Sequence, residues 1–319
     1  MRAAFHDRYG PPEVLRVEEL ERPAPKADEL LVRIHASTVN LTDCHMRGAY
    51  PPFWRFLIGF RAPKPQFRIA GREFAGVVEE VGADVTEFEP GDRVFGRRLG
   101  ANAEYLCVRD SGLVTPIPAG LTFEEAAGTF DGFHQGLTPM QRARVGEGTR
   151  LLVYGASGAC GTAAVQLGKH FGAHVTAVCN TKNVDLVRAL GADEVIDYLH
   201  EDFTKRREAY DVVLDAVGMH SFLRSRRALK RPGLFVATDR LVNFPLALLT
   251  RWSARRVVFT YREPDKADLL LLAQLLEAGE YRPVIDSTYP LDRVVEAHRY
   301  VETRQKTGNV VVTLDGAAR

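Results

Sequence analysis

The sequence predicts an α/β protein in which a doubly wound parallel sheet is combined with a separate β-rich part. Residues 151–237 alternate short apolar strands with helical patterns, which is typical of a parallel sheet covered by helices on both faces. Residues 1–120 instead alternate apolar and polar positions between frequent prolines and glycines. A chain of 319 residues is long enough to form two such domains.

The stretch LLVYGASGACG, residues 151–161, is the motif around which the parallel sheet is predicted. An apolar strand, Leu151–Tyr154, meets a turn of small residues and then a helical pattern. Ala156, Gly158 and Gly161 have the spacing of the dinucleotide fingerprint, with alanine at the first glycine position. Such a turn lets the backbone approach a pyrophosphate, which is held at the amino end of the helix. The alternative is a tight strand-to-helix turn that binds nothing.

Further strands and helices follow the glycine turn and favour the dinucleotide interpretation. A helical pattern over 184–190 separates the next two strands, so that a strand-helix-strand unit is complete. The expected strands are 174–178, 194–196, 211–216 and 234–237, with an edge strand over 256–261.

The end of the second strand indicates which nicotinamide cofactor binds. A carboxylate there would hold the ribose 2′-hydroxyl and repel a 2′-phosphate. This chain has Asn180, Thr181 and Lys182 instead, and Lys182 can neutralise a 2′-phosphate, so we expect NADPH. A solvated lysine at a helix start is the alternative, and the nearby Asp185 is a counter-signal.

Charge and composition exclude several classes of protein. The net charge of +1 and the lack of an aromatic-and-basic register give no reason to expect nucleic acid. The amino-terminal residues lack the apolar core of a signal peptide, and no stretch approaches the length of a membrane span, so we expect a cytoplasmic protein. Four scattered cysteines form neither a zinc pattern nor a disulfide framework.

The β-rich part and the carboxyl-terminal tail are expected to belong together. Pro116, Pro118 and Gly120 mark the end of the first domain, and a helix begins at Phe123. The tail is expected to return to the first domain. Its predicted elements are a helix over 267–278, an extended segment over 282–285, a helix over 293–303 and a strand over 309–314.

Several motifs in order resemble the medium-chain dehydrogenase/reductase superfamily, and within it the zinc-free quinone oxidoreductase branch. They are GPPEVLRVEE, VNLTDCHMRGAY, GREFAGVVEEVGADVTEFEPGDRVFG, GASGACG, ALGADEVIDY, YDVVLDAVG and YPLDRVVEAHRYVETRQKTGNVVV. The resemblance implies a GroES-like β-rich catalytic domain over 1–120, completed by 281–319, and a Rossmann domain over 121–280. It also implies an active site in the cleft between them and a homodimer formed through the edge strand.

The same resemblance implies that no metal is used. Where the zinc-dependent branch has a His-Glu pair, this chain has Arg72-Glu73, and the loop of the first ligand contains Asn40. The structural zinc lobe is absent, and Cys44 with His45 cannot complete a tetrahedral site. We therefore expect no metal ligands.

The family's catalytic pattern resembles Asn40, Asp43, Arg47 and Tyr50, but this chain has one residue fewer before the tyrosine. Asn40 would orient the nicotinamide or a substrate carbonyl, and Tyr50 would supply or relay a proton. In the alternative interpretation Asn40 and Asp43 only cap a helix, and Tyr50 is a pocket wall.

The fingerprint and the resemblance together predict the residues that contact the cofactor. They are Thr138, Ala156, Ser157, Gly158, Ala159, Cys160, Gly161, Asn180, Thr181, Lys182, Tyr198, Gly218 and Asn309.

Two stretches combine apolar and basic residues without any acid. They are residues 51–68 and 241–256. Each is expected to wall a pocket for a bulky apolar substrate, to contact a membrane surface, or to pack between domains or subunits.

These observations predict a zinc-independent, NADPH-dependent oxidoreductase that transfers hydride to a quinone or an α,β-unsaturated carbonyl. Two alternatives stay open. One is an enoyl-thioester reductase, and the other is a non-catalytic NADPH-binding regulatory protein.

Overall fold

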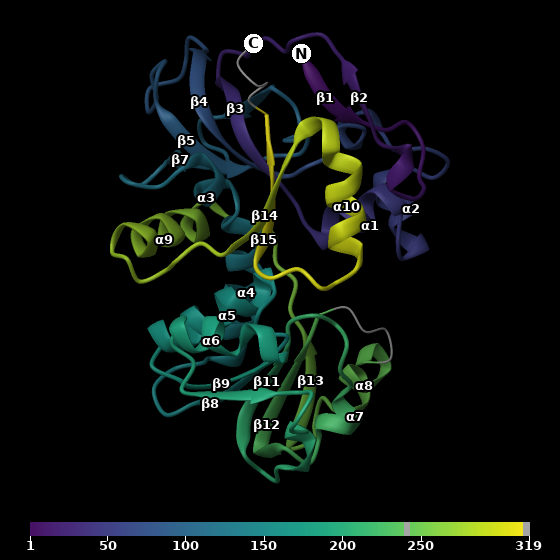
Figure 1. Cartoon of the computed structure of the whole chain (residues 1–319), viewed down its shortest axis with the longest axis vertical. Helices are drawn as coiled ribbons and strands as arrows, with labels where there is room; N and C mark the ends of the chain where they lie inside the picture. The colour runs from purple at the N-terminus through teal and green to yellow at the C-terminus, as the bar shows by residue number, and fades with distance from the viewer. Residues whose placement is uncertain (239–242, 315–319) are drawn as a thin grey trace. The chain divides into compact units, whose positions relative to one another are not determined.

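The computed structural model describes residues 1–238 and 243–314, which form two compact units. The first unit contains residues 1–130, 265–277 and the described chain from 283 onward, and the second contains residues 131–264 and 278–282 (Figure 1). The sequence placed the domain limits at 120 and 281. The helix Lys266–Glu277 (α9) accounts for part of this difference. It packs on strand Val114–Pro116 (β7), and its Lys266 Nζ donates a hydrogen bond to the carbonyl of Asp110 at 3.0 Å.

The first unit is built around a seven-stranded sheet. Its long strand Glu29–Val39 (β3) pairs antiparallel with three neighbours, which makes it the centre of the sheet. The other strands are β4 (Glu73–Val81), β5 (Arg93–Arg97), β6 (Tyr105–Arg109), β7, β14 (Ile285–Pro290) and β15 (Asn309–Thr313), and β1 (Arg2–Phe5) pairs separately with β2 (Arg16–Glu19). Leu30, Val32 and Ile34 alternate along β3 and are buried in the core.

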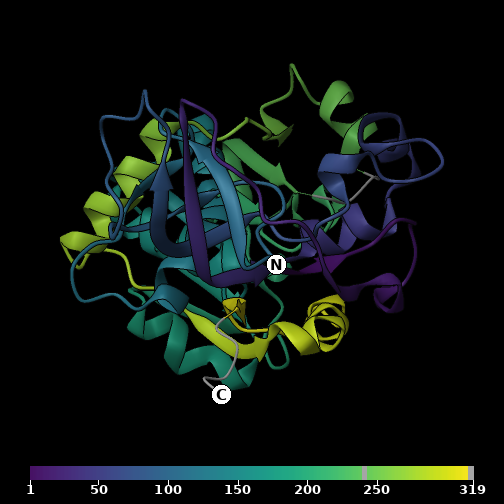
Figure 2. The same ribbon diagram turned by 90° about the horizontal axis from the view of Figure 1, so that it is seen from above.

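The carboxyl-terminal tail returns to the first unit, as expected. Strand β15 pairs with β3 in the register Val310 to Val39, and β14 extends the sheet beyond it. Helix Val294–Glu302 (α10) packs on helix Leu41–Gly48 (α1) and on the turn Pro12–Val14 (η1). Figures 1 and 2 show α10 beside these elements. The remaining helices of the unit are α2 (Arg55–Ile58), α3 (Phe123–Ala127) and α9.

The second unit contains the predicted doubly wound parallel sheet. All its pairings are parallel, and the spatial order β10-β9-β8-β11-β12-β13 places the first strand of the unit at the centre. The strands are β8 (Arg150–Tyr154), β9 (His174–Cys179), β10 (Glu194–Asp197), β11 (Tyr210–Asp215), β12 (Leu229–Ala237) and β13 (Arg255–Phe259). This is the 3-2-1-4-5-6 order of a dinucleotide-binding sheet, and β13 is an edge strand as expected.

Helices complete the second unit. They are α4 (Phe130–Ala143, all but its first residue in this unit), α5 (Ala159–His170), α6 (Val184–Ala189), α7 (Phe222–Ser225) and α8 (Asn243–Leu249). Helix α4 lies very close to α5 at two glycines. A Cβ added at Gly132 would lie 2.9 Å from the Ala159 carbonyl oxygen, and one added at Gly136 would lie 3.1 Å from the Ala164 nitrogen. The crossing therefore holds the amino end of α5 in a fixed position.

Two sequence predictions are limited by what the structure describes. Leu241 and Val242, the first residues of the second apolar and basic stretch, lie outside the described residues. Within residues 1–238 and 243–314, no helix is long and apolar enough to span a bilayer.

Candidate active site and cofactor site

The glycine turn places the amino end of α5 close to the strand before it. Gly158 is the N-cap with extended backbone, and no side chain caps the helix. Gly155 has a φ of 78°, a conformation that glycine adopts without strain. A Cβ added at Gly161 would lie 2.1 Å from the Gly155 carbonyl oxygen, so only glycine fits there. This arrangement has the features that the fingerprint predicted for a pyrophosphate site.

The turn lies at the point where the strand order of the sheet reverses. Strands β8 and β11 are neighbours there, and the loop after β11 contacts the glycine turn, because a Cβ added at Gly155 would lie 2.5 Å from Val217 Cγ1. The predicted Gly218, with a φ of 65°, is in this loop. Dinucleotides bind at such a reversal in parallel sheets.

A buried carboxylate fixes the loop after β11. Asp215 accepts the backbone N–H groups of Val217, Met219 and His220 at 3.3, 3.3 and 2.7 Å. Burial raises the pKa of Asp215 to about 6. The loop is therefore held in one shape beside the glycine turn, and Asp215, which holds it, was not among the residues predicted from the sequence.

The residues predicted to select the cofactor lie together after β9. Asn180 accepts a hydrogen bond from Asn183 Nδ2 at 2.8 Å, and Thr181 and Lys182 are exposed. Thr181 Oγ1 donates to Asp197 Oδ2 at 2.6 Å, and this bond holds the pKa of Asp197 below its usual range. The predicted Tyr198 follows Asp197 and is half exposed.

Asp197 is a residue of this group that sequence reasoning missed. A signal was present, because Asp197 ends β10 and the carboxyl ends of adjacent parallel strands share one edge of the sheet. An acid at the end of the third strand is therefore placed beside a loop that follows the second.

Two predicted cofactor residues lie away from the turn in sequence. Thr138 is on α4, and its Oγ1 is buried without a hydrogen-bond partner among the described residues. Asn309 begins β15 in the first unit, and its Nδ2 donates to the Val284 carbonyl at 3.3 Å.

The predicted catalytic residues Asn40 and Asp43 form a capping box at the start of α1. Asn40 Oδ1 accepts the backbone N–H groups of Thr42 and Asp43, and Asp43 Oδ2 accepts the N–H of Asn40 at 2.8 Å. Asn40 and Asp43 are both buried. The helix-capping role that the alternative interpretation gave to Asn40 and Asp43 is therefore present in the structure.

Arg72, which immediately precedes β4, and Glu73, its first residue, complete this network. Arg72 Nε donates to Asp43 Oδ1 at 3.2 Å and its Nη2 donates to Asn40 Oδ1 at 3.1 Å. Glu73 Oε2 accepts from Thr38 Oγ1 at 2.7 Å and from Asn40 Nδ2 at 3.4 Å. The hydrogen bond to Glu73 uses one of the two Nδ2 hydrogens of Asn40, and the other can be donated to a carbonyl oxygen.

Tyr50 lies at the other end of α1. Asn40 precedes the helix and Tyr50 follows its C-cap Ala49, so ten residues separate them, or about 15 Å at helical rise. Tyr50 is 56% exposed, and its ring lies 5.5 Å from that of His45. Asn40 and Tyr50 are therefore too far apart in this structure to contact the same substrate atom.

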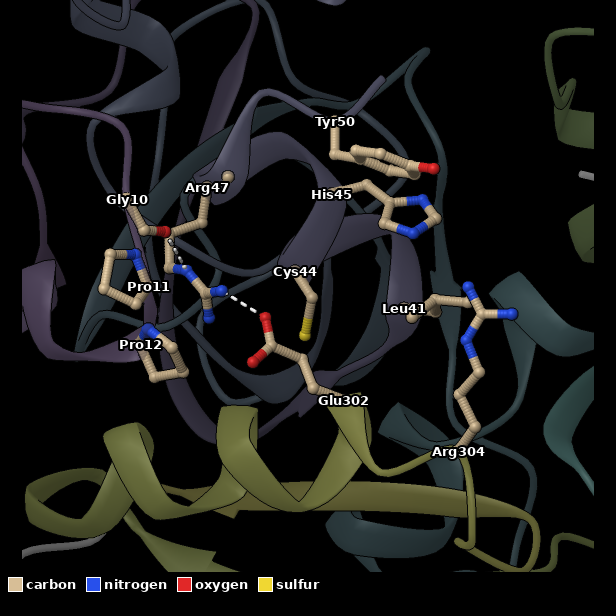
Figure 3. Close-up of a pocket in the computed structure, with 11 residues that line it drawn as sticks. Gly10, Pro11, Pro12, Leu41, Cys44, His45, Arg47, Tyr50, Glu302 and Arg304 are labelled. Atoms are coloured by element: carbon tan, nitrogen blue, oxygen red, sulfur yellow. Dashed lines mark hydrogen bonds and ion pairs between the residues drawn. The ribbon is translucent and has the colours of Figure 1, made fainter. Parts of the chain in front are cut away.

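Tyr50 lines a cavity of about 450 Å³ within the first unit (Figure 3). Its other walls come from the segment Gly10–Pro12, from α1 and from the end of α10. Arg47 closes one side: its Nε donates to the Gly10 carbonyl at 3.2 Å, and its Nη2 pairs with Glu302.

Cys44 faces the inside of the first unit. Its Sγ lies 3.4 Å from His298 Nδ1, and burial raises the pKa of the thiol strongly. The thiol form is a poor metal ligand and a poor nucleophile.

A mainly antiparallel β unit and a parallel sheet with the strand order of a dinucleotide-binding domain agree with the two-domain architecture expected of a dehydrogenase. Two family models agree with this class: the alcohol dehydrogenase GroES-like domain matches residues 26–130, and the zinc-binding dehydrogenase model matches residues 190–312.

Curated relatives and solved structures cover almost the whole chain. A 2-methylene-furan-3-one reductase of Solanum lycopersicum is 33% identical, over 98% of this chain and 79% of the relative. The chloroplastic NADPH-dependent alkenal/one oxidoreductase of Arabidopsis thaliana is 31% identical over the same shares. The quinone oxidoreductase structure from Coxiella burnetii is 26% identical with a TM-score of 0.88, over 98% of this chain and 99% of that one. The chain belongs to the medium-chain dehydrogenase/reductase family, in its quinone oxidoreductase-like branch.

Proposed function

We propose that the protein is an NADPH-dependent oxidoreductase that reduces a quinone or an α,β-unsaturated carbonyl. The names of its relatives support this class of reaction: a 2-methylene-furan-3-one reductase, an NADPH-dependent alkenal/one oxidoreductase and a quinone oxidoreductase. The observation that carries the proposal is the uncapped amino end of α5 at the reversal point of the sheet.

The residues of the second unit fit a dinucleotide. Gly161 leaves no room for a side chain between α5 and the turn, and no side chain occupies the cap position at Gly158. Among the residues that the structure describes, the buried Thr138 Oγ1 has no hydrogen-bond partner, and a buried hydroxyl without one is costly unless a ligand supplies it. When bound, the nicotinamide supplies the hydride that the reduction needs. The glycine turn would hold the pyrophosphate, and Thr138 would donate to or accept from the ligand.

We propose that Lys182 and Asn180 favour NADPH over NADH. Lys182 is exposed at the carboxyl end of β9, where a 2′-phosphate would lie. The hydroxyl hydrogen of Thr181 is committed to Asp197 in this structure, so Thr181 has none to donate to a phosphate. The Asp197 carboxylate also repels an anion, and Lys182 therefore has to offset it.

We propose that Asn40 orients the acceptor carbonyl. Its Oδ1 is fixed by the capping box and by Arg72, so the amide plane is held and its second Nδ2 hydrogen has a defined direction. A preorganised donor of this kind stabilises negative charge that develops on an oxygen. Asp43 positions Asn40 rather than touching substrate. Tyr50 lies at the opposite end of α1, so its part in the reaction is to relay the proton and not to contact the carbonyl that Asn40 orients.

We also propose that the reaction needs no zinc. At the position of the family's His-Glu pair, the Arg72 guanidinium is hydrogen-bonded to both Asn40 and Asp43. A fixed cation there repels a metal ion, and the protonated Cys44 is turned toward His298. Dialysis of active protein against a chelator should leave turnover unchanged, and loss of turnover that zinc restores would contradict this.

The variants Asn40→Ala and Tyr50→Phe test the catalytic assignment. We expect NADPH to bind as in the unmutated protein while turnover falls at least about tenfold in each variant. Asn40→Ala removes the donor to the carbonyl oxygen, and Tyr50→Phe removes the hydroxyl that relays the proton. Full turnover in both variants would contradict the assignment. Failure of the unmutated protein to oxidise NADPH with any acceptor would favour a non-catalytic binding protein. Turnover restricted to enoyl thioesters would favour the other alternative.

A cytoplasmic homodimer is the assembly that we propose. Strand β13 leaves one edge of the parallel sheet unpaired among the described strands. Helix α8 packs on β13, and apolar side chains beside this edge are exposed, including Leu248, Leu249 and Trp252. An unpaired edge flanked by apolar side chains is suited to pairing across a twofold axis.

A further inference from the structure

We propose that the segment around α2 docks the protein on an anionic lipid bilayer surface. The docking surface consists of the exposed side chains Phe53, Phe56, Leu57 and Phe60, and we call it the Phe53–Phe60 surface. These side chains are between 54% and 75% exposed, although they belong to the residue types that folded proteins usually bury. Figure 1 shows α2 at the outer edge of the first unit. The inference does not depend on the proposed enzymatic activity.

A buried side chain and several hydrogen bonds fix the backbone of this surface. Ile58 is 2% exposed and anchors the turn, and the carbonyl of Gly59 accepts a hydrogen bond from Tyr9 Oη at 2.7 Å. The Ile58 carbonyl accepts the N–H of Lys64 at 2.8 Å, and the Leu57 carbonyl accepts from Lys64 Nζ at 2.9 Å. Because the backbone is held at these points, the four apolar side chains are presented together instead of folding inward.

Two of the exposed rings support each other. The ring centroids of Phe56 and Phe60 are 5.9 Å apart, so the two side chains form one apolar projection. Segments that bind at a membrane surface insert clustered aromatic and leucine side chains at the boundary between headgroups and acyl chains.

The charge of the segment identifies the partner. Between Asp43 and Glu73 the chain has no acidic residue, and the segment carries Arg55, Arg61, Lys64 and Arg68. Basic residues around an apolar insertion are attracted to anionic phospholipid. A second copy of this surface would instead bring like charges together, because a twofold contact places the same patch on both sides. The charge therefore favours an anionic bilayer over self-association.

The two tryptophans of the chain provide a direct test. Trp54 adjoins the Phe53–Phe60 surface, whereas Trp252 is in the second unit. The full chain with Trp252→Phe keeps Trp54 as its sole tryptophan. It would be mixed with vesicles of phosphatidylcholine alone or of phosphatidylcholine with phosphatidylglycerol. We expect the Trp54 emission to shift to shorter wavelength and the protein to co-sediment only with the anionic vesicles, with binding that weakens as salt is added.

Substitutions in the same background identify the surface. Phe56→Ser with Phe60→Ser should lower the partition coefficient for anionic vesicles at least about tenfold, and Arg61→Glu should lower it too. Leu270→Ser is the matched control, since Leu270 is an exposed leucine on α9 of the same unit and should leave binding unchanged. Equal urea midpoints would show that all these variants fold.

Four results would overturn the proposal. One is the absence of co-sedimentation with anionic vesicles, and another is equal binding to both vesicle types. A third is a concentration-dependent increase in mass without lipid that Phe56→Ser with Phe60→Ser abolishes, which would assign the surface to a second copy. A fourth is a raised KM of that double variant for a water-soluble quinone with no effect on vesicle binding, which would make the surface a substrate wall.

Discussion

Arg47 donates a hydrogen bond from Nη1 to His298 Nδ1 at 3.1 Å inside the first unit. A guanidinium has no acceptor, so Nδ1 must be unprotonated and His298 is held neutral. Burial lowers the pKa of His298 well below its usual value, and the charge of Arg47 adds to this effect.

This contact predicts that acid destabilises the protein. Below about pH 6.5, His298 is protonated in the unfolded chain but stays neutral in the folded protein. The free energy of unfolding therefore falls by up to about 1.4 kcal/mol per pH unit. His298→Gln should remove this part of the slope in urea unfolding between about pH 5 and 7. His174→Gln, at an exposed histidine on β9, should keep it. An unchanged slope in His298→Gln would contradict the prediction.

The ion pair between Arg72 and Asp43 predicts a large loss of stability when the cation is removed. Both side chains are buried, so Arg72→Met leaves the Asp43 carboxylate without its charged partner at a cost of about 3–5 kcal/mol. Urea unfolding measures this. Arg188→Ala breaks an exposed pair with Asp185 and should leave the midpoint nearly unchanged. A loss for Arg72→Met as small as that of the control would mean that the network is not structural.

Alanine at two glycines of the turn separates folding from cofactor approach. A Cβ at Gly161 meets the Gly155 carbonyl at 2.1 Å, so Gly161→Ala should cost about 1–3 kcal/mol of stability. A Cβ added at Gly158 would lie 3.7 Å from the Gly155 carbonyl oxygen, which is an ordinary contact, so Gly158→Ala should keep the unfolding midpoint. It should nevertheless weaken NADPH binding, because the methyl group stands at the helix end where the pyrophosphate is expected. Unchanged NADPH affinity in Gly158→Ala would place the pyrophosphate elsewhere.

Lys182→Ala tests the choice of cofactor. One charge-assisted hydrogen bond to a 2′-phosphate is worth about 1.5–3 kcal/mol, so the Kd for NADPH should rise about 10- to 100-fold. The Kd for NADH should stay the same, since NADH lacks that phosphate. Fluorescence titration of both cofactors measures the two constants. Equal increases in the Kd for both cofactors would show that Lys182 does not bind the 2′-phosphate.

Strong local patterns made most of the parallel sheet predictable. The apolar runs at Leu151–Tyr154 and 174–178 became β8 and β9 within a residue, because buried parallel strands are apolar on both faces. The edge position of β13 and the return of the strand over 309–314 to the first domain were also predicted, although its pairing with β3 was not.

Contacts between distant segments were harder to predict. The helix over 267–278 was expected in the tail that returns to the first domain, whereas the family-based limits placed it in the Rossmann domain, and nothing local in α9 indicates that it packs on β7. The motif at Asn40 predicted chemistry, but its pattern did not show that Arg72 and Glu73 would surround it. The bond between Thr181 and Asp197 likewise depends on the alignment of two strands, not on the sequence near either residue.

NADPH-dependent reduction of a quinone or an enone can be tested in a single titration. Purified protein is titrated separately with NADPH and NADH by nicotinamide fluorescence, and a quinone or an enone is then added to the tighter complex. We expect NADPH to bind more tightly than NADH and to be oxidised when either acceptor is added. Tight NADPH binding that no quinone or enone oxidises would contradict it.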